Sequence, residues 1–234
     1  MIKHFFTGSD NIIDLIREDH KILPVLSRFS VPLGFGDKTI SRLCRDASIS
    51  EDLFLVAVNL TINGRFDKEA AARLSPTEVA RFLHKSHDYF LNYKFPHIRT
   101  NLLAALDESH KDINPIIVRF YDDFIRHVER HFDYEETVVF PYVKSIEEGE
   151  SSNYNISIFR HQHDEVGDTL RELKNIILRY YATSRPDVMY DVLVDIYDVE
   201  DDLDSHSLIE NNILVPLVAS LEKNRRTRNS HTSS

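Results

Sequence analysis

Four long stretches of helical periodicity between residues 76 and 221 restrict the fold more than any other feature of the sequence. In each stretch apolar side chains recur at steps of three and four residues, which places them on one face of an α-helix. The breaks between the stretches are short, and short connections join antiparallel neighbours. The sequence therefore predicts an all-α chain built on an up-down-up-down four-helix bundle, with helices at about 76–109, 114–149, 155–182 and 188–221.

Capping and turn residues indicate where these helices end. Asn114 is expected to cap the second helix, and Pro115 fits its first turn, where a missing N–H costs nothing. The stretches GESSN (149–153) and SRPD (184–187) separate the later helices.

The residues before the bundle predict a second, smaller helical unit. Its first helix is expected to be capped by Ser9 or Asp10 and is followed by a glycine-containing turn, PLGFGDK (32–38). Two short helices are expected next, the second of them capped by Ser50. The chain then divides into a small helical N-terminal domain, a linker, the bundle and a flexible tail, at residues 1–62, 63–76, 77–221 and 222–234.

Composition excludes several classes of protein. With 6 Gly and 8 Pro in 234 residues, the chain has few of the residues that turn-dense β folds need. A net charge of −10 argues against a general nucleic-acid-binding surface. No apolar run reaches the roughly 18 residues that a membrane span requires. We therefore expect no nucleic-acid partner and no membrane insertion.

Cysteine usage and the first residues indicate the compartment. Cys44 is the one cysteine, so a single chain can form neither a disulfide nor a cysteine-ligated iron–sulfur cluster. The start, MIKHFFTGSD, lacks the basic segment and long apolar segment of a secretory signal. These features predict a cytoplasmic location, where thiols stay reduced.

Histidine is unusually frequent in the bundle segment. The chain has 12 His, and nine of them lie between His84 and His206. Some of the histidines and two glutamates fall on the apolar stripes, where the core is expected. An ionised carboxylate in a helical core is costly unless a cation compensates it. The stripe residues that predict a shared metal site are His87, His131, Glu135, His163, His206 and Glu210.

The spacing of two of these pairs supports a metal site. Both His131 and His206 are followed by Glu at the fourth position and by Pro at the tenth, and residues four apart lie on one helix face. Four imidazoles and two carboxylates suit iron, manganese or zinc. Six groups shared by two ions leave positions open for an oxo or hydroxo bridge, water or a diatomic molecule.

Other histidines have weaker signals. His161 and Glu165 also stand four residues apart, but they share a polar face with Asp168 and are expected at the surface. His84 and His127 each precede a site histidine by about one turn. For both, a role beside the metal and a purely structural role stay open.

With these residues the chain resembles hemerythrin-like proteins, and more specifically the repair-of-iron-centres family of di-iron proteins, which is tied to iron–sulfur cluster repair. The matching segments are HFDYEETVVFP (131–141), HDEVGDTL (163–170), HSLIENNILVP (206–216) and, more loosely, SHDYFLNYKFP (86–96), with one extra residue before Pro96. The resemblance implies two iron ions, for which manganese or zinc can substitute, held by His87, His131, Glu135, His163, His206 and Glu210. Glu135 and Glu210 are the implied bridging carboxylates.

The resemblance implies a protein that handles iron and O2, NO or peroxide under oxidative or nitrosative stress, with an iron–sulfur protein as its partner. The N-terminal unit resembles that family's small helical domain, whose loop carries adjacent cysteines. Here the corresponding residues 32–40 contain none, and Cys44 reads as a small core residue. The alternative is therefore a module that binds O2 or NO, or senses redox state, and signals to a protein partner. A ferritin-like ferroxidase is disfavoured because that class uses Glu-x-x-His.

Overall fold

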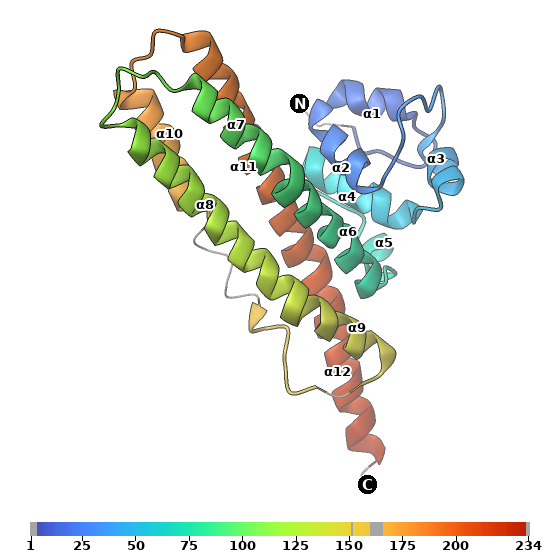
Figure 1. The fold of residues 1–234 in the computed structure, drawn as a ribbon. Coiled ribbons are helices and arrows are strands. Elements are labelled where there is room, and N and C mark those ends of the chain that lie inside the picture. The colour runs from blue at the N-terminus through green and yellow to red at the C-terminus, as the bar shows by residue number, and fades with distance from the viewer. Residues whose placement is uncertain (1–3, 151, 160–165, 233–234) are drawn as a thin grey trace.

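The structure is a computed structural model that describes residues 4–150, 152–159 and 166–232. Within these ranges the chain forms helices and no strand, so the predicted all-α class is confirmed (Figure 1). In the same ranges, extended backbone pairs only at a single antiparallel bridge between Asn11 and Thr39. No helix in the described part of the chain is both long and apolar enough to cross a membrane.

Long rods make up the bundle, and three of them are interrupted by a five-residue π-helical turn. The first rod is α6, η2 and α7 (Pro76–Tyr89, Phe90–Lys94, Phe95–Ala105), and the second is α8, η3 and α9 (Asn114–Tyr134, Glu135–Val139, Phe140–Glu148). The third is α10 (Val166–Tyr180), and the last is α11, η5 and α12 (Pro186–Ile209, Glu210–Leu214, Val215–Thr232). Figure 1 shows the rods side by side with alternating direction, α10 packing on α8 and α11 on α7.

A proline explains each π turn. Pro96, Pro141 and Pro216 each occupy the second position of the α-helix that follows a π turn. Proline has no N–H and its ring clashes with the carbonyl four residues earlier, so it is poorly tolerated inside a regular helix. The residue before each proline instead donates to the carbonyl five residues back, from Phe95 to Phe90 in the first rod. The extra residue changes the direction in which the preceding side chains face.

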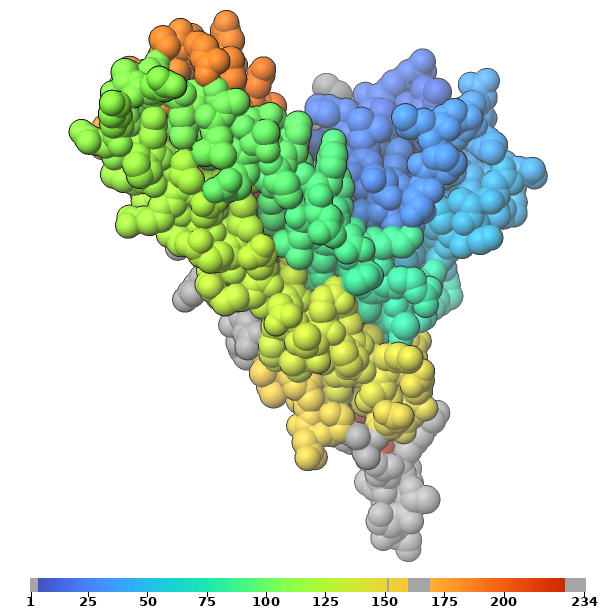
Figure 2. All heavy atoms as spheres, viewed as in Figure 1, coloured from blue at the N-terminus to red at the C-terminus, as the bar shows by residue number. Residues whose placement is uncertain are grey.

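The N-terminal unit consists of short helices packed against the bundle. They are α1 (Ile12–Glu18), η1 (His20–Ile22), α2 (Leu23–Arg28), α3 (Ile40–Ala47), α4 (Glu51–Asn63) and α5 (Lys68–Ala72). The predicted Ser50 cap is present, since its hydroxyl accepts from the Leu53 N–H at 3.2 Å. Figure 2 shows this unit, coloured blue to cyan, lying against one side of the rods.

Several predicted helix ends in the N-terminal half are wrong. Asn11, rather than Ser9 or Asp10, occupies the cap position of α1, because the Asp10 carboxylate instead accepts from the backbone and hydroxyl of Thr7. Extended backbone at Asp19 separates α1 from η1. Residues predicted as a linker include α5, whose Ala70 and Ala71 are buried.

Differences within the bundle also have local causes. Asn114 is the first residue of α8 and does not cap it; its amide donates to the Asp107 carbonyl and accepts from the Tyr181 hydroxyl. The first rod ends at Ala105, four residues before the predicted end. The last rod continues past Leu221 to Thr232.

The third helix was predicted to begin near Asn155, but residues 155–159 form turns. The Asn155 side chain accepts from the Ser157 N–H, and the Ile156 N–H donates to Glu222 of α12 at 2.8 Å. Residues 160–165 lie outside the described part of the chain, which resumes with Val166 as the first residue of α10.

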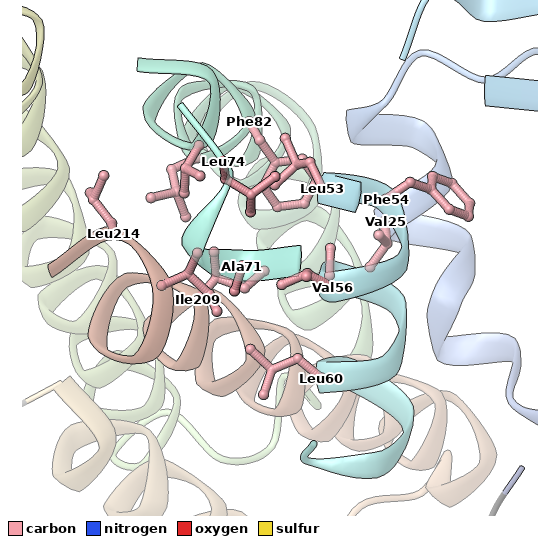
Figure 3. Packing of buried hydrophobic residues seen from close by; sticks show 14 of the residues in the cluster. Val25, Leu53, Phe54, Val56, Leu60, Ala71, Leu74, Phe82, Ile209 and Leu214 are labelled. Carbon is pink, nitrogen blue, oxygen red and sulfur yellow. The ribbon is translucent and has the colours of Figure 1, made fainter. Parts of the chain in front are cut away.

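One continuous core joins the N-terminal unit to the bundle. Val56 and Leu60 of α4 are directed toward Ile209 of α11, with Ala71 of α5 beside them (Figure 3). A second buried cluster fills the other end of the bundle around Phe95 and Tyr121. Burial of this kind contributes roughly 25 cal/mol for each Å² of apolar surface, so the two units stabilise each other.

Candidate metal centre

Four buried side chains from three rods converge between the two apolar clusters. His87 comes from α6, Glu135 is the first residue of η3, His206 comes from α11, and Glu210 is the first residue of η5. One potential ligand atom from each of the four lies within 4.8 Å of the others. All four side chains are at most 4% exposed, so water does not compensate their charges. This arrangement is a candidate site for a cation.

The π turns place both carboxylates. Glu135 and Glu210 occupy the same position in their rods, six residues before Pro141 and Pro216. The histidine four residues before each carboxylate lies on the same face, so that His206 Nε2 is 2.7 Å from Glu210 Oε1 and His131 Nε2 is 3.5 Å from Glu135 Oε1. The repeated spacing in the sequence therefore corresponds to repeated geometry.

The first rod departs from this repeat. Phe90 holds the position at the start of its π turn that Glu135 and Glu210 hold in the others. His87 stands three residues before its turn rather than four, and buried Ser86 takes the fourth position. The looser match of residues 86–96 in the sequence thus reflects where the histidine stands relative to the π turn. His87 Nε2 nevertheless reaches Glu135 Oε2 at 3.0 Å.

Several buried polar atoms of the cluster have no hydrogen bond of normal geometry to described residues. They are His87 Nε2, both carboxylate oxygens of Glu135 and both ring nitrogens of His206. Leaving a buried donor or acceptor without a partner costs about 1–3 kcal/mol, and more for a charged group. The side chains present therefore fit a metal ion, which imidazole nitrogens and carboxylate oxygens coordinate well.

Burial dominates the protonation of the cluster. It raises the pKa of Glu135 well above its ordinary value of 4.5, and the negative charge of Glu210 raises it further. Burial also lowers the pKa of His87 to about 4, which keeps this imidazole neutral near pH 7. For Glu210 burial is the largest single influence and acts in the same upward direction, but His206, Glu135 and His131 together outweigh it, and the pKa of Glu210 is lowered. In the absence of a cation, one carboxylate of the pair keeps a proton.

Glu136 supports the cluster from outside. Its carboxylate accepts from His87 Nδ1 at 2.6 Å and from His84 Nδ1 at 2.8 Å. A bond at Nδ1 fixes the tautomer that leaves His87 Nε2 available toward Glu135, as carboxylates beside metal-bound histidines do. His84 thus contacts Glu136 rather than the cluster itself, and His127 does not join the four converging residues.

We expect Glu136→Ala to weaken metal binding about 10- to 100-fold, because His87 loses the group that orients it. Competition with a chelator of known affinity measures this change. Glu129→Ala, which removes an exposed carboxylate from the same rod, is the control and should bind like the unmodified chain. Equal affinity in both variants would show that Glu136 has no orienting role.

The six predicted site residues divide into three groups. His87, Glu135, His206 and Glu210 come together, and His131 lies beside Glu135 with 13% of its side chain exposed. His163 lies outside the described residues, as do His161 and Glu165. Glu136 was missed because it directly follows Glu135 and has no spacing signal of its own.

The comparisons with known proteins agree with this geometry. Residues 78–218, more than half of the chain, match the family model described as the hemerythrin HHE cation-binding domain. No curated protein matches the chain significantly. The narrower resemblance to the repair-of-iron-centres family stays a prediction. Since the match covers more than half of the chain and includes both His–Glu pairs, the chain belongs to the hemerythrin HHE cation-binding family.

Proposed function

We propose that this protein is a non-haem di-iron protein that handles iron and O2, NO or peroxide under oxidative or nitrosative stress. The observation that carries the proposal is the convergence of two buried carboxylates and two buried imidazoles on one interior spot. Glu135 and Glu210, which occupy equivalent positions, would bridge two ions. His87, His131, His163 and His206 would complete the set of ligands.

The protein's own residues would set the conditions of the reaction. Iron, when bound, supplies the redox chemistry toward diatomic molecules or peroxide. The packed rings of Phe132 and Phe140 lie beside His87, with ring centroids 3.9 and 5.5 Å from it, and exclude water from that side. Glu136 holds His87 in one tautomer. The site is thereby dry and rigid, which favours a small ligand over a large one.

An anaerobic metal count with optical spectra tests this proposal. Protein produced with ample iron and purified without oxygen is expected to hold about two iron ions per chain, since six ligands are shared between two positions. Its absorption spectrum should change when O2 or NO is added. A chain that holds no metal under these conditions, or whose spectrum is unaffected by both gases, would contradict the proposal.

The state of Cys44 favours a second candidate, a module that binds or senses O2 or NO. The Cys44 side chain is buried, and burial raises its pKa to about 12, so the reactive thiolate is scarce at neutral pH. A thiol-dependent transfer step through this residue is disfavoured. The N-terminal unit instead shares a core with the bundle, through which the state of the site could reach a signalling partner.

Iron transfer distinguishes the two candidates. A repair protein should lose iron to a protein that lacks its iron–sulfur cluster, whereas a sensing module should bind gas reversibly and keep its metal. Mixing the loaded chain with such an acceptor, followed by a metal count on the separated proteins, gives the answer. An iron–sulfur protein is the proposed partner in the first case and a signalling protein in the second.

A further inference from the structure

A small hollow reaches the candidate metal centre from the side of α11. Its volume is about 90 Å³, and its wall includes His131 and His206. Most of the remaining wall is apolar, and the polar residues on it besides the two histidines are Glu200, Asp204 and Ser207. Since a water molecule takes up about 30 Å³ of liquid, the hollow has room for about three waters or for an ion with part of its hydration shell.

The hollow shares one wall residue, Asp204, with a larger acidic cleft. The cleft has a volume of about 470 Å³, lies between the N-terminal unit and α11, and also has Asp204 in its wall. Its other carboxylates are those of Asp19, Asp198, Asp201 and Asp202. Lysine or arginine side chains pair with two of them, Lys21 with Asp201 and Arg28 with Asp202. Asp204 thus lines both the cleft and the hollow.

Charge is distributed unevenly along this path. Glu200 forms an ion pair with Lys174 of α10, which neutralises that side of the hollow. Asp204 is exposed and forms no ion pair with any of the described residues, so its charge is available to a passing cation. At the inner end, His206 is 2% exposed and its Nδ1 has no hydrogen-bond partner among the described residues. An acidic outer end and an imidazole at the inner end attract a divalent cation and repel anions.

We propose that Asp204 marks the entry route by which a divalent cation, Fe2+ in the proposed function, passes from the acidic cleft through the hollow to His206 and His131. This inference rests on the proposed metal site and adds the path to it. The four converging side chains are closed to solvent, so an ion needs such a path. A single negative charge some 6 Å from a doubly charged ion, in water at 0.1 M salt, changes the encounter rate about three- to tenfold.

Metal uptake by the metal-free, full-length chain tests the route. Fe2+ is mixed with the chain without oxygen, and the rise of absorbance or quenching of tyrosine fluorescence is followed over time. Asp204→Asn is expected to slow uptake about three- to tenfold at low salt while reaching the same final metal content. Asp204→Lys is expected to slow it further. Raising the salt concentration should reduce the difference, because screening weakens the attraction.

Asp191→Asn is the matched control, because it removes the same charge from an exposed position on the same helix but not from the hollow. Its uptake rate should equal that of the unmodified chain. Equal rates in the unmodified chain, Asp204→Asn and Asp191→Asn, or equal slowing in both Asn variants, would overturn the route while leaving the metal site intact. A chain that never takes up Fe2+, with or without substitutions, would overturn the proposed function together with the route.

Discussion

Glu135→Gln is expected to remove nearly all bound metal without unfolding the protein. The glutamine keeps the shape of the side chain but supplies no negative charge to a cation. At least a 100-fold loss of affinity is expected, because a charged ligand in a water-free site contributes well over the roughly 1.4 kcal/mol that each factor of ten represents. Metal analysis after gel filtration measures the loss, and Glu129→Gln on the exposed face of α8 is the control.

The metal-free form of this variant should be at least as stable as the metal-free unmodified chain. Glutamine resembles a protonated glutamate, and burial beside Glu210 already raises the pKa of Glu135 well above 4.5. The folded chain therefore binds this proton more tightly than the unfolded chain does, so stability falls as pH rises from about 4.5 toward the raised pKa. His87, with its pKa lowered to about 4 from 6.5, has the opposite effect between those values, but it does so in both proteins, so the difference between them reports Glu135.

Urea unfolding of both metal-free proteins at a series of pH values above 4.5 gives the comparison. The stability of the unmodified chain relative to Glu135→Gln should fall as the pH rises. Adding metal should stabilise only the unmodified chain, by about 2.7 kcal/mol at a free concentration of 100 times Kd. If the variant keeps full metal content, or is stabilised by metal as much as the unmodified chain, Glu135 does not hold the ion.

The periodicity of the sequence predicted the bundle and placed six polar residues on its core faces, because one helix face must enter the core. Four of the six converge in the described part of the chain. A histidine and a glutamate four residues apart on that face must then point into the same part of the core, as His206 and Glu210 do. The π turns were not predicted, since they depend on how the chain accommodates a proline rather than on hydrophobic pattern. For the same reason, the position of His87 relative to the π turn in the first rod could not be predicted from residue spacing alone.

Tertiary contacts determine the other features that the sequence pattern did not predict. Asn114 is a residue type that often caps helices, but its side chain forms hydrogen bonds with Asp107 and Tyr181, which lie 7 and 67 residues away in the sequence. Glu136 becomes significant only when α6 brings His87 and His84 to it. Such partners are far apart along the chain, and a local pattern carries no signal for them.

Asp202→Ala is expected to lower the free energy of unfolding by about 3–5 kcal/mol, the usual cost of removing one partner of a buried ion pair. Arg28 of the N-terminal unit has 1% of its side chain exposed, and its Nη2 lies 2.6 Å from the Asp202 carboxylate. Its Nε has no hydrogen-bond partner among the described residues. Without Asp202, a buried guanidinium would remain uncompensated.

The exposed pair Lys21–Asp201, one residue away on α11, provides the control. Both of its side chains are about half exposed, so Lys21→Ala should change the free energy of unfolding by no more than about 1 kcal/mol. Joining Arg28→Met to Asp202→Ala should recover much of the loss, because no buried charge then remains. Urea unfolding of the unmodified chain and these three variants measures these values, and equal losses from Asp202→Ala and Lys21→Ala would contradict the assignment.

The same contact connects the N-terminal unit to the metal centre. The Arg28 guanidinium lies 5.0 Å from the centre of the Phe90 ring, and that ring lies 6.1 Å from the ring of His206. Asp202 also precedes His206 by one helical turn on α11. Arg28 contacts both Phe90 and Asp202, which lie next to His206. Asp202→Ala should therefore lower the metal affinity as well as the free energy of unfolding, whereas Lys21→Ala should leave metal affinity unchanged and stability nearly so. Loss of stability with unchanged metal affinity would mean that the N-terminal unit supports the bundle but does not position the site.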